Sequence, residues 1–286
     1  MVCDRAPMTM NYTGERMVPE LADRLTFWEH IYRYRFACQF VKGLDVLDVA
    51  CGEGYGSAAI LKAGASSIKG MDVSDEACSH ARNKYGIDAQ VGDAENIALA
   101  SGSVDLVTSF ETIEHLRQPD RFLDEALRVL RADGKLIIST PDAAPYRLRN
   151  ACNPFHFKEL TESDFVALLS ERFKRIQLFT QYPVSAGWWS PRALASEHSP
   201  FRGFRRCQNL IRRIVCPELV SRTELESARK DPVRYITKSQ PRLARLANPY
   251  SVRPKSSFAR EVAMYVIAVA SPDNNEATIQ DLPHRV

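Results

Sequence analysis

Short apolar runs alternate with amphipathic segments along most of the chain. Apolar runs typical of buried strands lie at residues 46–50, 67–73, 88–91, 104–109, 135–140, 175–180 and 262–269. Segments with helical spacing lie at residues 26–42, 57–63, 75–85, 121–131 and 161–170. Strands that alternate with helices indicate parallel pairing through right-handed crossovers. The pattern therefore predicts an α/β fold built on a doubly wound, seven-stranded, mostly parallel sheet.

A glycine-rich turn follows the first predicted strand. Three glycines, beginning at Gly52, come directly after the apolar run Val46–Ala50 with the spacing G-x-G-x-G, whereas a dinucleotide-binding loop has G-x-G-x-x-G. Asp48 and Glu53 would face or flank a group bound there, and carboxylates repel a pyrophosphate but favour a cation. The turn therefore predicts a nucleoside ligand that carries positive charge.

This stretch resembles the first motif of the class I S-adenosylmethionine-dependent methyltransferases, Asp-x-x-x-Gly-x-Gly, which is matched by Asp48, Gly52 and Gly54. The combination Thr-Gly-Glu-Arg, Glu-His and Arg-Tyr between residues 13 and 34 looks like methyltransferases of bacterial polysaccharide and cell-surface sugar pathways. The resemblance implies a Rossmann-like fold with an antiparallel last strand and S-adenosyl-L-methionine as cofactor. The cofactor-binding residues that it implies are Asp48, Ala50, Gly52, Gly54, Asp72, Val73, Asp93, Ala94 and Phe110.

Two acidic residues lie at the ends of later strands. Asp72 ends the second strand and can accept hydrogen bonds from both ribose hydroxyls, while Ser74 is the better N-cap for the next helix and would leave Asp72 free. Asp93 lies at the carboxyl edge of the third strand, where doubly wound sheets bind ligands. By resemblance, Asp93 takes the adenine amino group and Ala94 adds a backbone contact. These two carboxylates are the predicted nucleoside contacts.

Carboxylates and imidazoles cluster after the fourth strand. Glu111, Glu114 and His115 would share one face if a helical turn starts there, and His156 could approach from beyond the fifth strand. Together the four residues predict a site for a divalent cation, and they look like the metal site of small-RNA 2′-O-methyltransferases and ubiquinone-pathway O-methyltransferases, where the cation is often magnesium. A site without metal would keep His115 or His156 as general base, beside Glu114. Both readings stay open.

Basic residues are concentrated near the carboxyl end, although the net charge is only +3. Residues 186–260 hold sixteen lysines and arginines against five aspartates and glutamates, including a basic amphipathic helix predicted over residues 201–215. This segment would contact an anionic membrane or cap an anionic substrate, or it is a solvated lid. The predicted divisions are an arm and helix over the site at 1–43, the catalytic domain at 44–183 and 258–271, a basic insertion at 184–257 and a disordered tail at 272–286.

The leading functional prediction is O-methylation of a sugar hydroxyl on a nucleotide sugar, glycan or lipid-linked intermediate, with an anionic acceptor accounting for the basic insertion. The alternatives are an RNA 2′-O-methyltransferase, for which nucleic-acid motifs are lacking, a small-molecule N- or O-methyltransferase, a silent cofactor-binding protein and a nicotinamide-dependent oxidoreductase. Seven scattered cysteines and the lack of a leader-like or membrane-spanning apolar run predict a cytoplasmic protein. The oligomeric state is left open.

Overall fold

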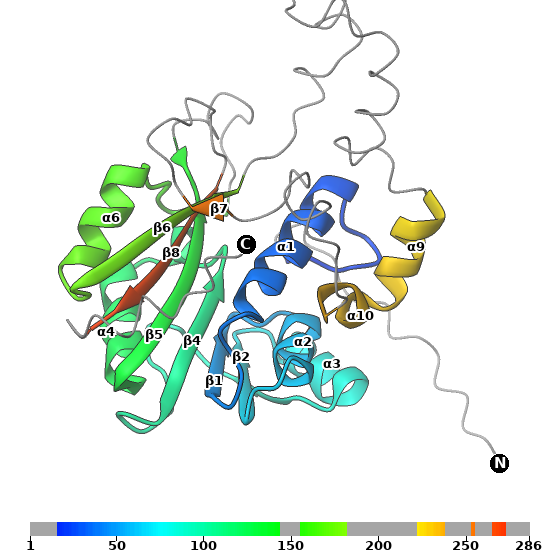
Figure 1. Ribbon diagram of the computed structural model, residues 1–286, viewed down its shortest axis with the longest axis horizontal. Helices are drawn as coiled ribbons and strands as arrows, with labels where there is room; N and C mark the ends of the chain where they lie inside the picture. Colours follow the sequence, from blue (N-terminus) through cyan, green and yellow to red (C-terminus); the bar gives the residue numbers. More distant parts are fainter. Residues whose placement is uncertain (1–15, 144–154, 182–221, 238–252, 255–264, 273–286) are drawn as a thin grey trace, which may run out of the picture.

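A mixed sheet forms the centre of the protein, which is described by a computed structural model over residues 16–143, 155–181, 222–237, 253–254 and 265–272 (Figure 1). The strands are β1 (Asp45–Val49), β2 (Ser67–Asp72), β3 (Asp88–Val91), β4 (Val104–Phe110), β5 (Leu130–Pro141), β6 (Arg175–Gln181), β7 (Arg253–Pro254) and β8 (Tyr265–Ser271). Their order is β3-β2-β1-β4-β5-β8-β6-β7. The predicted basic helix at 201–215 and nearly all of the predicted tail lie outside the described residues.

The pairing matches the prediction of a mostly parallel sheet with an antiparallel last strand. β1 to β5 pair in parallel, and β8 runs antiparallel between β5 and β6. The seven predicted strands are all present, and the two-residue β7 is an addition at the edge beside β6. The predicted doubly wound α/β fold is confirmed.

Helices cover both faces of the sheet (Figure 1). The helical elements are α1 (Arg24–Ala37), α2 (Tyr55–Lys62), α3 (Asp75–Tyr85), the 3-10 turn η1 (Ile113–His115), α4 (Pro119–Val129), α6 (Glu162–Ser170), α9 (Arg222–Lys230) and α10 (Pro232–Thr237). Neighbouring β1 residues face opposite ways, since Val46 packs in the core with α1, α2 and α3 while Leu47 packs in the core with α4 and α6. Burial on both faces explains why the strands are nearly continuous apolar runs. Within the described residues, no helix has the length and apolarity needed to cross a membrane.

Two predicted elements differ from the observed ones. The helix predicted over 121–131 ends at Val129, and Leu130 already begins β5 by pairing with Val104 of β4, just before a register shift between the two strands. In α1, Glu29 and Arg33 carry charged side chains, which usually lie at the surface of a helix, but both are buried, with 2% and 1% of their surfaces exposed. In both cases a tertiary partner decides the outcome, which the local pattern does not contain.

Part of the predicted insertion belongs to the core. Helix α10 packs against α1 and α2. Ile236 of α10 and Ala228 of α9 are buried in the same core cluster as these helices. The Tyr235 ring lies 6.1 Å from that of Trp28, and Arg35 donates a hydrogen bond from Nη1 to the Tyr235 carbonyl at 3.0 Å. Residues 222–237 therefore hold the helix that covers the site.

We expect the substitution Ile236→Ala to lower the free energy of unfolding by about 3 kcal/mol, because it leaves a cavity between α10 and the helices beneath it. Urea denaturation measures the change. Leu61→Ala on α2 is the control, since this side chain is 42% exposed and its loss should cost less than about 1 kcal/mol. Equal losses in the two variants would contradict the packing of α10.

Candidate functional site

A tight glycine turn joins β1 to α2. Gly54 is the N-cap of α2, with φ at 84°, a backbone conformation that side chains rarely adopt. A Cβ atom on Gly54 would lie 2.4 Å from that of Ala81 in α3, and one on Gly56 would lie 2.1 Å from the Tyr34 ring in α1. The second and third glycines therefore allow α3 and α1 to pack against the turn.

A cavity of about 600 Å³ opens beside this turn, at the carboxyl ends of the first four strands. It lies where the strand order reverses between β1 and β4, which is the usual ligand position in a doubly wound sheet. The predicted cofactor residues that line it are Ala50, Gly52, Asp72, Val73, Asp93, Ala94 and Phe110. Of the predicted catalytic and metal residues, Glu111 and His115 line it, whereas Glu114 and His156 lie beside it.

Asp48 lies beneath the turn and does not line the cavity. Its carboxylate accepts hydrogen bonds from the hydroxyls of Ser57 at 2.6 Å, Thr108 at 2.7 Å and Tyr34 at 3.2 Å. Burial raises the pKa of Asp48 to about 6, although the three hydroxyls act in the opposite direction. In this position Asp48 ties the turn to α1 and β4, instead of facing the bound group as the motif suggested.

Asp72 does line the cavity, but it is not free of protein contacts as expected. Ser74 caps α3 by accepting from the Ala77 amide, as predicted. The Asp72 Oδ2 atom nevertheless accepts from the Gly52 amide and its Oδ1 atom from the Ser74 amide, both at 2.9 Å. Each carboxylate oxygen can accept a further hydrogen bond, so the capacity to hold ribose hydroxyls is retained.

Glu111 is separated from the other members of the predicted cluster. It has φ at 53°, so the helical turn expected from residue 111 does not form and only the 3-10 turn at 113–115 follows. Ser139 donates from Oγ to the Glu111 carboxylate at 2.7 Å, and the buried Arg33 approaches the same oxygen at 3.7 Å. The expectation of one shared helical face is therefore wrong, because the Arg33 and Ser139 contacts hold Glu111 apart.

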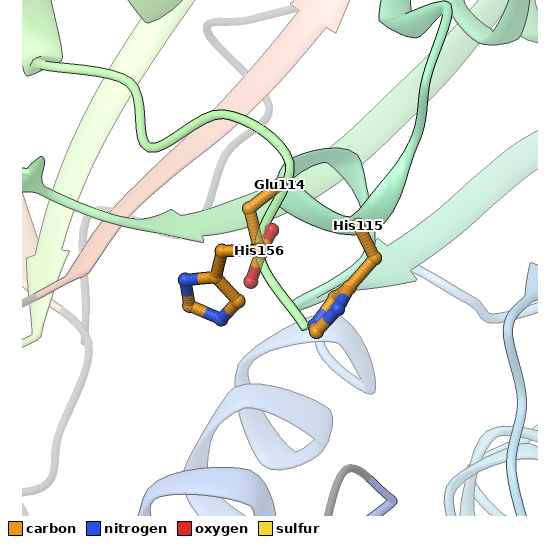
Figure 2. Close-up of side chains that lie close together, drawn as sticks. All are labelled: Glu114, His115 and His156. Atoms are coloured by element: carbon orange, nitrogen blue, oxygen red, sulfur yellow. The ribbon is translucent and has the colours of Figure 1, made fainter. Parts of the chain in front are cut away.

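Glu114, His115 and His156 do come together (Figure 2). One ligand atom from each lies within 4.8 Å of the others, and the two imidazole rings meet edge to face. The η1 turn supplies Glu114 and His115, and the Glu114 carbonyl accepts from the Phe157 amide at 2.9 Å, which holds the segment that carries His156. Two elements far apart in the sequence thus build one polar cluster at the rim of the cavity.

The Glu114 carboxyl group is the most buried part of this cluster. Thr140 donates to its Oε2 atom at 3.1 Å, while Oε1 has no hydrogen-bond partner within the described part of the chain. Burial first, and then the nearby Glu111, raise the pKa of Glu114 well above its usual range. Burial and the nearby His115 lower the pKa of His156. A cation or a hydrogen-bond donor would satisfy the open oxygen of Glu114.

Helix α1 contributes residues that the motifs left without a specific role. His30 and Tyr34 line the cavity, so the helix predicted over the site supplies part of its lining. The Tyr55 hydroxyl lies 3.3 Å from His30 Nδ1, and burial and the Arg33 charge lower the pKa of His30 well below its usual value. In the sequence, the Glu-His and Arg-Tyr pairs at residues 29–30 and 33–34 are the pattern that could point to His30 and Tyr34.

Glu53 in the glycine turn is fully buried and faces away from the cavity, with its Oε2 atom 3.7 Å from His80 Nε2. Burial raises the pKa of Glu53 to about 7. The folded protein therefore binds this proton more tightly than the unfolded chain does. The stability gained from the protonated form is lost as the pH rises from 4.5, the ordinary pKa of the group, through about 7.

We expect Glu53→Gln to raise the free energy of unfolding by about 1–3 kcal/mol at about pH 8 and to leave it nearly unchanged at about pH 4, because glutamine imitates the protonated carboxyl group. Denaturant titrations at both pH values measure the difference. Glu171→Gln is the control, since that side chain is 66% exposed. A variant no more stable than the parent at about pH 8 would contradict the buried, protonated state.

Comparison with known proteins finds similarity to methyltransferases. Residues 47–138 match the family described as "Methyltransferase domain". A probable S-adenosylmethionine-dependent methyltransferase of Mycolicibacterium smegmatis is 34% identical over 168 residues, which are 57% of this chain and 65% of the relative. A ubiquinone biosynthesis O-methyltransferase of Rhizobium etli is 30% identical over 104 residues, 35% of this chain and 42% of the relative. The chain thus covers less than two thirds of the length of each.

A solved structure shares the fold over most of the chain. It is a SAM-dependent methyltransferase, possible histamine N-methyltransferase, from Thermotoga maritima, with a TM-score of 0.53 and 14% sequence identity. The match covers 89% of this chain and 98% of that one. At this identity, the likeness concerns the fold alone.

Proposed function

We propose that this protein, which carries a class I S-adenosylmethionine-dependent methyltransferase domain with a Rossmann-like fold, methylates a hydroxyl oxygen of a small acceptor, a sugar foremost. The observation that carries the proposal is one cavity whose lining includes Gly52 and Asp72, at the ends of β1 and β2, and His115, which follows β4 on the other side of β1. Donor and acceptor would meet in the space between them. Since methyl transfer is an in-line displacement, such positioning supplies much of the catalysis.

The cavity lining supports a positively charged methyl donor. Among the described residues of the lining, the carboxylates are Asp23, Asp72, Glu76, Asp93 and Glu111. A sulfonium nucleoside gains from such surroundings, whereas a polyanion such as RNA is repelled. In the proposed complex, Asp72 holds the ribose and Asp93 the adenine amino group.

His115 is the proposed general base. Its Nδ1 atom lies 3.1 Å from the Phe155 carbonyl oxygen, which can only accept, so Nδ1 carries the proton and Nε2 the basic lone pair. The bound donor would supply the methyl group, with the electron pair of its carbon–sulfur bond going to sulfur as the acceptor oxygen bonds to the methyl carbon. His115 would take the hydroxyl proton, and S-adenosylhomocysteine would be released. A base is required here because a sugar hydroxyl is a poor nucleophile at neutral pH.

A divalent cation is the second candidate for activating the acceptor. Glu114, His115 and His156 would hold it, and the buried Oε1 atom of Glu114 without a partner among the described residues fits that role. The cation would lower the pKa of an acceptor hydroxyl and hold a neighbouring one, as a vicinal diol allows. Two imidazoles favour a transition metal over magnesium. In this case His115 is a ligand instead of the base.

The size of the cavity and the charge of the chain support the proposed class of acceptor. A cavity of about 600 Å³ leaves limited room beside the donor, so a small molecule or the end of a glycan fits better than RNA. The name of the Rhizobium relative, an O-methyltransferase, supports oxygen as the methylated atom. An anionic or lipid-linked acceptor is a further proposal that rests on the basic residues of 186–260, most of which lie outside the described part.

Incubation with methyl-labelled S-adenosylmethionine and a panel of nucleotide sugars, glycans, catechols and RNA tests the proposal. We expect label on a hydroxyl of a small acceptor. His115→Asn should lower turnover at least about 100-fold while S-adenosylhomocysteine affinity stays within about two-fold, because the base acts only in the chemical step. His80→Asn, outside the cavity, is the matched control. Label on RNA alone or on an amine would contradict the proposed acceptor.

Chelation separates the two ways of activating the acceptor. If His115 acts as base, treatment with a chelator leaves turnover unchanged and metal analysis finds less than stoichiometric cation. If the cation acts, turnover falls at least about ten-fold and returns with a transition metal more readily than with magnesium. In that case Glu114→Gln should lower metal content together with activity, whereas Glu159→Gln on the far side of His156 should change metal content less.

A further inference from the structure

Residues 16–22, here called the strap, run along the cofactor end of the cavity. Lys84 of α3 donates to the Glu20 carboxylate at 3.0 Å, and Arg229 of α9 donates to the Ala22 carbonyl. The strap is thus attached to the helices on either side of it. Groups that it carries are positioned before any ligand arrives, which lowers the entropic cost of binding.

Arg16 is the first residue of the strap and lies across the glycine turn. Its Cγ and Cδ atoms are 3.7 and 3.8 Å from the point where a Cβ on Gly52 would be. Its Nη1 atom donates to Ser74 Oγ at 3.0 Å, and Nη2 lies 3.9 Å from the Glu76 carboxylate. These contacts hold the guanidinium between the turn and the start of α3. A ligand resting on the turn would lie directly against it.

Charge makes this position unusual within the cavity. The other charged lining residues are the five carboxylates named above, and Arg16 is the single lysine or arginine among the described residues of the lining. An arginine at the turn would repel a ligand that carried positive charge alone. The arrangement instead suits a ligand that carries positive charge and one separate anionic group.

We propose that Arg16 binds the carboxylate of the cofactor's methionine moiety. This rests on the proposed function, since S-adenosylmethionine has one anionic group, its carboxylate, beside an ammonium and a sulfonium. A guanidinium can form two parallel N–H···O hydrogen bonds with a carboxylate, and both are charge-assisted. Arg16 is therefore a cofactor-binding residue, and the strap places it.

Isothermal titration of two ligands tests this assignment without knowledge of the acceptor. S-Adenosylhomocysteine contains the carboxylate, whereas 5′-methylthioadenosine keeps the adenine, ribose and sulfur but lacks the amino-acid portion. We expect Arg16→Met to weaken S-adenosylhomocysteine binding by about ten- to hundred-fold and 5′-methylthioadenosine binding by less than about two-fold. Arg16→Lys should retain part of the affinity, because it keeps the charge but not the planar fork.

Lys84→Met is the matched control, because it loosens the strap at Glu20 without removing a cavity-lining charge. It should weaken S-adenosylhomocysteine binding much less than Arg16→Met does, because the guanidinium remains and keeps its contacts with Ser74 and Glu76. The thermal unfolding midpoints of all variants establish that they fold. Equal weakening of the two ligands by Arg16→Met, or no weakening of S-adenosylhomocysteine, would overturn the assignment of Arg16 to the carboxylate. It would leave the proposed function standing. Failure of the unsubstituted protein to bind either ligand would overturn the proposed function as well.

Discussion

The buried carboxylate of Asp48 fixes the end of the cavity that the nucleoside occupies in the proposed complex. Burying a charged group is costly unless hydrogen bonds replace its water. Here hydroxyls from α1, α2 and β4 meet this one side chain on β1. Because Asp48 precedes the glycine turn and Ser57 follows it, their hydrogen bond clamps both ends of the turn. The position of the turn, and hence of the Gly52 amide that holds Asp72, follows from this contact.

A second polar network fixes the opposite end. Arg33 is enclosed between α1 and the sheet, where its Nε atom donates to Gln181 of β6 at 2.9 Å and its guanidinium faces Glu111. Gln181 in turn donates to the Glu29 carbonyl at 3.1 Å. The left-handed backbone at Glu111 is strained for a residue with a side chain, and the contacts from Arg33 and Ser139 compensate for it. This network locks α1 over the sheet and begins the turn that carries His115.

The sequence is informative where the deciding signal is local. Helix α3 was predicted at its observed bounds, since Ser74 caps its start and Gly86 takes the left-handed conformation after its end. The strands and the glycine turn are local in the same sense. Local signals do not predict the environment of Arg33, because its partner Gln181 lies 148 positions away. They also do not decide the structure at Leu130, which suits a helix face as well as a strand. The contact between Glu114 and His156 likewise depends on how the chain returns after β5.

Part of the cavity lining is aromatic, and this suits the charge change in the proposed reaction. Tyr34 meets Tyr55 and Phe110 edge to face, with ring centroids 5.5 and 5.0 Å apart, and all three line the cavity. Aromatic rings attract a sulfonium through their quadrupole. As the methyl group leaves, that positive charge disappears, so surroundings less polar than water favour the transition state over the bound donor. The carboxylates therefore orient the donor, and the aromatic rings lower the polarity of the surroundings in which the bond breaks.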